Sequence, residues 1–303
     1  MKIAVAGSSN TDMIIQVPRL PRPGETILGG TFSMAAGGKG ANQAVAAARA
    51  GGEVTLIARV GDDVFGARAI EGFEKDDIDV RYIIKDKTAP SGVALIFVGD
   101  DGENSIGVAS GANRCLMPDD IQSAGDGILS SNILVLQLES PLETVQKAAE
   151  LASSAGIPVI LNPAPAQPLP DELLEFISII TPNESEAELL TGVIVTDEVS
   201  ANEAAIRLRK NGVSVVIVTM GAAGAYVQSE IFTGMVPGFA VEPVDTTAAG
   251  DVFNGALAVA LGENRSLQEA VRFANAAAAL SVTRLGAQPS APDRNEIDAL
   301  VQS

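Results

Sequence analysis

The sequence predicts an α/β fold in which helices cover both faces of a mainly parallel sheet. Short β-branched segments alternate along the chain with Ala-, Leu- and Glu-rich segments of helical spacing, a pattern typical of βαβ units. Two predicted strands contain fully apolar stretches, at residues 133–136 and 215–218, as expected of strands buried on both faces. With 303 residues, of which 47% are hydrophobic, the chain can bury a large core.

The order of the elements follows from these segments. The β-branched runs predict strands at residues 2–6, 54–60, 132–138, 157–161, 177–181, 213–219 and 225–228. Helical spacing predicts helices between most of them, including residues 41–50, 64–75, 141–154 and 201–210. Because a helix separates most consecutive strands, the strands are expected to run parallel.

Two regions interrupt the alternation, residues 11–17 and residues 92–109. Both are predicted to be antiparallel strands, the second with a hairpin turn at Asp101-Gly102. From residue 93 to 98 every side chain is apolar, so both faces of this strand need cover.

We therefore predict a small sheet outside the main one, within a single domain that spans residues 1–303. It would be a lid formed by about residues 11–35 and 90–109. Its second face would be covered by substrate, by the large domain or by another subunit.

Composition excludes several kinds of chemistry and partner. The sequence has no histidine, which excludes Ser-His and Cys-His nucleophile pairs and His-ligated zinc, and its single cysteine, Cys115, excludes an intramolecular disulfide. A net charge of −18 opposes binding to nucleic acid or anionic membrane. With no targeting signal and no apolar segment of about 20 residues, we expect a cytoplasmic protein with neither kind of partner.

The strongest local motif is DTTAAGD at residues 245–251, which leads into an apolar helix. Small residues and Gly250 at a helix start let backbone N–H groups converge on an anion. Asp251 would lie close enough to a bound phosphate to accept a proton from an attacking hydroxyl. The alternative is an aspartate that only caps the helix.

A second motif is GGKGAN at residues 37–42, again before a helix. It is not a Walker A loop, because Gly40 stands where Ser or Thr is required. Lys39 and Asn42 offer hydrogen-bond donors to hydroxyls or phosphate, while the glycines permit close approach. The alternative is a glycine-rich turn with a solvated lysine.

Polar residues also follow several predicted strands, at the edge where α/β proteins bind ligands. Asn10 and Asp12 follow the first strand and could bind sugar hydroxyls or form a turn. Glu139 follows the strand at 132–138 and could act in the site or cap a helix.

Two further segments offer nucleotide contacts. Asn183 and Glu186 form either a capping box or a phosphate contact with a carboxylate that organises hydrated Mg²⁺. The segment TMGAAG at 219–224 is either a tight turn or a loop that admits a nucleotide.

In this order, the motifs resemble the PfkB family of carbohydrate kinases and, within it, the ribokinases. The resemblance covers nearly the whole chain; its segments are residues 7–12, 37–42, 182–184, 219–224, 245–251, 253–255 and 283–290. It implies a ribokinase-like three-layer α/β/α fold, with a mainly parallel central sheet plus a small β-sheet lid. It also implies ATP-dependent phosphorylation of D-ribose at O5, giving ribose 5-phosphate and ADP.

The resemblance further implies roles for individual residues. The sugar would be held by Asn10, Asp12, Gly38, Lys39, Asn42, Glu139 and Asp251. Asp251 would be the catalytic base, beside an anion hole formed by the amides of Ala248, Ala249 and Gly250. ATP would contact Asn183, Thr219, Gly221, Gly224, Gly250 and Asn275.

Two cations and a dimer are also implied. An activating K⁺ would be held by Asp245, Thr247, Ser281, Arg284, Gly286 and Ser290, and Mg²⁺ indirectly by Glu186. Ser281 stands where relatives often have another small residue, which matters little if the ligand is a carbonyl. The lid would form a homodimer interface. The alternatives are another sugar kinase of this family, for deoxyribose or fructose, and a non-catalytic sugar-binding regulator.

Overall fold

Nine strands form the central sheet of the computed structural model, which describes residues 1–101 and 103–303. From edge to edge they are β13 (Thr233–Pro237), β12 (Gly224–Gln228), β11 (Val215–Thr219), β10 (Ile179–Ile180), β9 (Val159–Leu161), β8 (Ile133–Leu136), β1 (Lys2–Ala6), β4 (Glu53–Gly61) and β5 (Asp79–Asp86). The strands from β11 to β5 run parallel, and β12 and β13 are antiparallel additions. The predicted mainly parallel sheet is confirmed.

Two edge strands, β5 and β13, are absent from the sequence prediction. β5 mixes Asp79, Arg81 and Lys85 with apolar residues, and much of it is only partly buried. An edge strand has one unpaired side and less cover, so its sequence lacks the continuous apolar run that marks the central strands.

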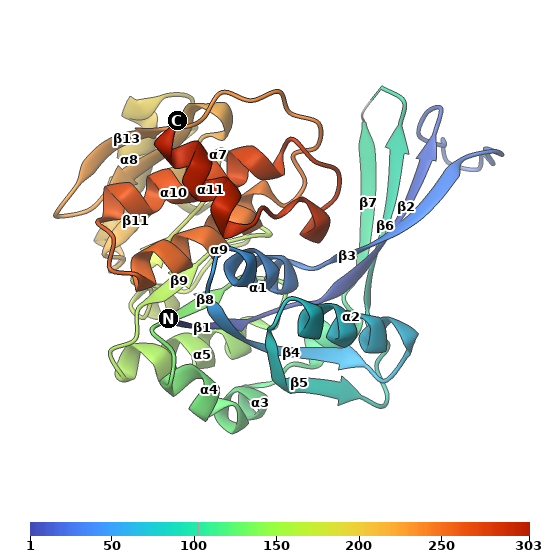
Figure 1. Ribbon diagram of the computed structural model, residues 1–303, viewed down its shortest axis with the longest axis horizontal. Coiled ribbons are helices and arrows are strands. Elements are labelled where there is room, and N and C mark those ends of the chain that lie inside the picture. Colours follow the sequence, from blue (N-terminus) through green and yellow to red (C-terminus); the bar gives the residue numbers. More distant parts are fainter. Residues whose placement is uncertain (102) are drawn as a thin grey trace.

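Helices cover both faces of the sheet (Figure 1). Alternate strand residues contact the two helical layers. One layer contains α1 (Lys39–Arg49), α2 (Val64–Lys75), α9 (Ala249–Gly262), α10 (Leu267–Ser281) and α11 (Arg294–Gln302). The other contains α3 (Pro118–Ser123), α4 (Gly125–Leu129), α5 (Leu142–Ser154), α6 (Asp171–Leu174), α7 (Glu184–Thr191) and α8 (Glu198–Lys210). On β1, Ile3 and Val5 pack against the first layer, while Ala4 and Ala6 pack against the second. The predicted three layers are confirmed.

A separate small sheet projects beside the main one (Figure 1). Its strand order is β3 (Thr31–Gly37), β2 (Asn10–Val17), β6 (Gly92–Gly99) and β7 (Asn104–Ala109). β3 and β7 are antiparallel to their neighbours, but β2 and β6 run parallel, which corrects the wholly antiparallel expectation. The predicted turn between β6 and β7 includes Gly102, which lies outside the described residues.

Both faces of the small sheet carry exposed apolar side chains. By register, Phe32 and Leu95 share one face, and both are more than half exposed. Val108 lies on the opposite face. It pairs with Ala94, which in turn pairs with Asp12, so Asp12 lies on that face too. The sheet is thus apolar on both sides, as its sequence predicts.

Within the described part of the chain, no helix is both long and apolar enough to cross a membrane.

Candidate active site

The carboxyl ends of β1 and β8 meet the start of α1. Oε2 of Glu139 accepts a hydrogen bond from the Ser8 hydroxyl at 2.5 Å and another from the Lys39 backbone N–H at 3.0 Å. The N-cap of α1 is Gly38, which has no side chain and a φ of 90°. A Cβ there would lie 2.6 Å from the backbone nitrogen of Asn10, so glycine is required. Glu139 therefore does act as a helix cap, but for a helix 100 residues before it.

Asp251 lies in the first turn of α9 and is 4% exposed. Its Oδ2 accepts a hydrogen bond from Nδ2 of Asn42 at 2.9 Å, and its Oδ1 accepts one from Nε2 of Gln43 at 3.0 Å. The N-cap of α9 is Ala248, which has no side-chain cap. The side chain of Asp251 is therefore held across the fold by α1, contrary to the capping alternative.

Asn42 has a second feature that suits a ligand. Its Oδ1 is buried and has no hydrogen-bond partner among the described residues. A buried acceptor without a partner is costly, and a hydroxyl donor would satisfy it.

Four charged side chains gather between α1, α9 and the small sheet. Burial raises the pKa of Asp12 to about 6, and the nearby carboxylates of Glu139 and Asp251 add to this. Burial also raises the pKa of Asp251, against the opposing effect of Lys39 and two amide donors. For Lys39, burial lowers the pKa, but Asp251 and Glu139 more than offset it, so the net direction is upward and the amine stays charged.

Asn10 is buried at the base of the small sheet. Its Oδ1 accepts a hydrogen bond from Nδ2 of Asn113 at 2.7 Å, and Oδ1 of Asn113 accepts one from the Ser9 N–H at 2.9 Å. A Cβ at Gly92 would collide with both amides. Asn113 is not among the residues predicted from the sequence, because nothing in its own segment distinguishes it from a turn residue.

The start of α9 has the features of an anion site. The backbone of Ala248 has the left-handed helical conformation, with φ 60°, and turns the chain so that α9 begins at Ala249. The N–H of Ala249 donates to Thr246 O. The first N–H groups of a helix lack intrahelical acceptors, so those of Gly250 and Asp251 can bind an anion. A Cβ at Gly250 would meet nothing within 4 Å, so this side of the turn is open.

Asn183 and Glu186 form the predicted capping box. Oδ1 of Asn183 accepts from the Glu186 N–H at 2.8 Å, and Oε2 of Glu186 accepts from the Asn183 N–H at 2.9 Å. Asn183 also pairs with Thr219 in an isolated parallel bridge. Burial raises the pKa of Glu186, while Lys39 is near enough to lower it. This helix start therefore lies close to the charged cluster.

The other predicted nucleotide residues meet at the end of β13. Gly221 and Gly224 have φ of 50° and 104°, and a Cβ at Gly224 would collide with the backbone of Val236. Nδ2 of Asn275 donates to Val236 O at 3.0 Å and to Pro237 O at 3.2 Å.

The residues predicted for a monovalent cation come from two segments that are hydrogen-bonded to each other. One is residues 245–247, and the other is residues 281–290, which run from the last residue of α10 through a loop to η3 (Gln288–Ser290). Asp245 accepts from the Thr247 N–H at 2.9 Å and from the Gly286 N–H at 2.8 Å. Burial raises the pKa of Asp245, but these hydrogen bonds outweigh it and lower the pKa overall. Arg284 forms an ion pair with Glu296. The loops thus offer an ionised carboxylate and backbone oxygens, which suit K⁺.

The described residues offer few direct ligands for a divalent cation. The described residues contain no group of three or more His, Cys, Asp or Glu side chains placed to hold a metal ion. One Glu186 oxygen is already bonded to a backbone N–H. Mg²⁺ would therefore have to be held through water and phosphate oxygens, as predicted for Glu186.

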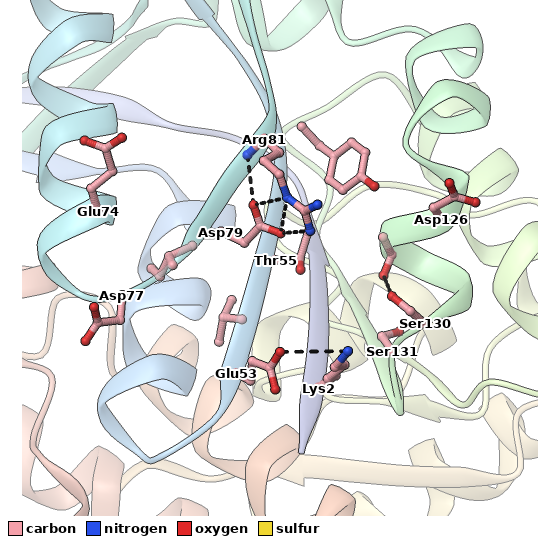
Figure 2. Close-up of a pocket in the computed structure, with 14 residues that line it drawn as sticks. Lys2, Glu53, Thr55, Glu74, Asp77, Asp79, Arg81, Asp126, Ser130 and Ser131 are labelled. Carbon is pink, nitrogen blue, oxygen red and sulfur yellow. Dashed lines mark hydrogen bonds and ion pairs between the residues drawn. The ribbon is translucent and has the colours of Figure 1, made fainter.

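A cavity of about 660 Å³ lies at the other end of the strands from these residues (Figure 2). There Lys2 pairs with Glu53, and Arg81 pairs with Asp79. Its lining includes none of the predicted site residues. It faces the amino ends of the strands, whereas the predicted residues follow the carboxyl ends, where α/β proteins bind ligands.

Comparison with known proteins yields consistent matches. A model of the pfkB family of carbohydrate kinases matches residues 1–294. The ribokinase of Haemophilus influenzae is 48% identical over 97% of this chain and 96% of its own length. The deoxyribokinase of Salmonella typhi is 41% identical over 96% of each. The structure of Arabidopsis thaliana ribokinase complexed with ribose and ATP superposes with a TM-score of 0.91, at 35% identity, covering 99% of this chain and 98% of that one.

Proposed function

This chain belongs to the pfkB family of carbohydrate kinases, and we propose that it catalyses the ATP-dependent phosphorylation of D-ribose at O5. The products are ribose 5-phosphate and ADP. The observation that carries this proposal is Asp251, a buried carboxylate at a helix start whose N–H groups can bind phosphate. It lies beside a cluster of polar and charged groups suited to a sugar.

Ribose is held by residues from three parts of the chain. They are Asn10, Asp12, Gly38, Lys39, Asn42 and Glu139. The partnerless Oδ1 of Asn42 accepts from a sugar hydroxyl, and the charged Lys39 donates. Asp12 and Glu139 accept from hydroxyls, so the site matches a small polyhydroxylated molecule.

Asp251 accepts the proton from the attacking hydroxyl as the γ-phosphoryl group leaves ADP. Its raised pKa makes it a better proton acceptor than an exposed aspartate. The proposed anion hole of the Ala248, Ala249 and Gly250 amides stabilises the charge on the transferring group, and the Ala249 N–H, which donates to Thr246 O in the structure, would turn to the phosphate when it binds. Phosphoryl transfer depends mainly on positioning and charge stabilisation, which these groups supply.

ATP lies against Asn183, Thr219, Gly221, Gly224, Gly250 and Asn275. Mg²⁺, organised through Glu186, neutralises phosphate charge when bound. A K⁺ ion held by Asp245, Thr247, Ser281, Arg284, Gly286 and Ser290 keeps the loops beside α9 in order. The net charge of −18 makes such local positive charge necessary for an anionic cosubstrate.

The small sheet acts as a lid over the sugar and as the contact between two copies in a homodimer. Its register supports both roles, because Asp12 lies on one face and the exposed Phe32 and Leu95 lie on the other. A dimer would bury the second face. We place the enzyme in the cytoplasm, which accords with its single cysteine.

Deoxyribose is the second candidate substrate, favoured by the 41% identity to a deoxyribokinase. A fructose kinase is a further family alternative. A non-catalytic sugar-binding regulator is less well supported, since Lys39, Gly250 and Asp251 are all retained.

An ATP-coupled assay with ribose, deoxyribose, fructose and adenosine tests the proposal. We expect the highest kcat/KM with ribose. A higher value with deoxyribose or fructose would reassign the substrate. If none of the four is phosphorylated, but calorimetry detects sugar binding, the protein is a non-catalytic sugar-binding regulator.

A further inference from the structure

Gln43 lies at the centre of a group of buried amides beneath Asp251 and is 0% exposed. Its Nε2 donates to Oδ1 of Asp251 at 3.0 Å and to Oδ1 of Asn162 at 3.1 Å. Its Oε1 accepts from Nε2 of Gln137 at 2.7 Å. Both N–H donors of this side chain are therefore used, one of them on a carboxylate.

The carboxylate of Asp251 is bonded at both oxygens by neighbouring residues of α1. Asn42 donates to Oδ2 and Gln43 to Oδ1, so the carboxylate plane cannot rotate without breaking one of these bonds. Asn42 also faces the sugar in the proposed site, but Gln43 is fully buried and does not. Gln43 is fixed in turn by residues that follow two central strands, Gln137 after β8 and Asn162 after β9.

Packing alone does not explain this amide. Burying an amide costs free energy unless each polar atom is bonded, and an apolar side chain of similar size would fill the same space without that requirement. Gln137 Oε1 is left buried without a partner among the described residues, so the group of amides is not fully satisfied. The contact that distinguishes Gln43 is its hydrogen bond to a carboxylate, which is stronger than one between neutral groups.

We propose that Gln43 is a positioning residue: it holds the Asp251 carboxylate in the orientation that accepts the proton from the sugar hydroxyl. This inference rests on the proposed kinase function. A displacement of a reacting group by about 1 Å can cost about a hundredfold in rate, so a fixed carboxylate plane matters for the chemical step. Sugar binding also uses Asn10, Asp12, Gly38, Lys39, Asn42 and Glu139, to none of which the Gln43 side chain is hydrogen-bonded, so it should depend on Gln43 less than the chemical step does.

Other charged groups also act on Asp251 and must be separated from this effect. Lys39 favours the ionised carboxylate, while Glu139, Asp12 and Glu186 oppose it. Asp12 has a pKa of about 6 and contacts the sugar in the proposed site, so its titration should affect KM. A change in kcat with unchanged KM therefore reports on Asp251.

The test replaces Gln43 by a side chain of similar length that has no hydrogen-bond donor, Gln43→Met. We expect kcat to fall about tenfold or more, as for loss of one hydrogen bond to a charged group, with KM for the sugar changed less than about threefold. The pKa of Asp251 should rise, because its ionised carboxylate loses the hydrogen bond from Gln43. The acid limb of the kcat pH profile, where kcat falls as the pH is lowered, should therefore shift to higher pH by about one unit.

A second variant keeps the test decisive if Gln43→Met does not fold. Gln43→Glu preserves shape but places a second carboxyl group beside Asp251, which should move the acid limb upward further. Ser131→Ala is the matched control, since it removes one buried hydrogen bond, to Ile128 O, in the lining of the cavity at the amino ends of the strands. Thermal unfolding compares the stability of all variants.

The sugar used is whichever one the wild-type enzyme phosphorylates fastest, so a wrong choice of ribose leaves this test intact. If the wild type phosphorylates no sugar, the proposed function fails first. If the wild type is active and both Gln43 variants keep kcat and its pH profile while unfolding earlier, Gln43 is only structural and the inference is overturned.

Discussion

Asn113 donates a hydrogen bond to Asn10 at 2.7 Å, across 103 residues of sequence. The bond occupies Oδ1 of Asn10 and leaves its Nδ2 end to donate. Asn113 is itself fixed by the backbone N–H of Ser9. The orientation of a proposed sugar ligand is therefore set from η1 (Gly111–Cys115), which follows the small sheet.

Replacing Asn113 by Leu should weaken sugar binding more than the chemical step. Loss of a buried hydrogen bond of about 1 kcal/mol, with Asn10 left free to rotate, predicts a KM raised about fivefold. We expect kcat to stay within about threefold of the wild type. Steady-state kinetics measure both, and an unchanged KM would show that Asn113 does not orient Asn10.

Asp251→Ala should abolish ATP-dependent phosphorylation while part of the sugar affinity survives. Loss of a general base lowers kcat by about 10²- to 10⁴-fold. Calorimetry with ribose reports the remaining binding. Retention of near-normal kcat would refute the assignment of Asp251 as the base.

Asp12→Asn should make the protein more stable at pH 8 but bind sugar less well. The pKa of Asp12 is raised from 3.8 to about 6, so the folded state holds its proton more tightly than the unfolded state. That stabilisation is complete below pH 3.8 and is lost as pH rises through 6. The gain from removing the buried charge is about 3 kcal/mol above pH 6 and falls to about 0.5 kcal/mol near pH 4. Thermal unfolding of the wild type and Asp12→Asn at pH 8 and pH 4 measures the gain in stability. An equal gain at the two pH values would contradict the raised pKa of Asp12.

K⁺ should activate the enzyme through the loops that Asp245 and Gly286 join. At fixed ionic strength we expect a higher rate in K⁺ than in tetramethylammonium, and Asp245→Asn should reduce this difference. Because the variant lacks a negative charge at the site, its activation should need more K⁺. Equal wild-type rates in the two salts would rule out the cation site.

Leu95→Asp should convert the proposed dimer to a monomer. Leu95 is 54% exposed and shares a face of the small sheet with Phe32, so a charge there would be buried on association. Sedimentation velocity measures the mass. Ile231→Asp is the control, since Ile231 is 83% exposed between β12 and β13. A wild-type monomer, or a Leu95→Asp dimer, would exclude this interface.

Much of the fold could be predicted because its signals are local. The apolar runs of β8 and β11 mark strands buried on both faces, and the helices between strands force a parallel order. The edge strands β5 and β13 were not predicted. They are less fully buried than the central strands, so their sequences carry fewer consecutive apolar residues. The parallel pairing of β2 with β6 was not predicted either, since these strands lie far apart in the sequence.

The order of the elements, the small sheet with two apolar faces and the motifs that carry the family resemblance can all be recognised in the residues alone. Which side chains meet depends on the folded arrangement. It brought Glu139 to the start of α1, Asn113 to Asn10, and Gln43 to Asp251, and it resolved whether Asp251 caps its own helix. Spacing along the chain encodes local periodicity, whereas these contacts join residues more than 90 positions apart and exist only once the strand ends are packed against α1 and α9.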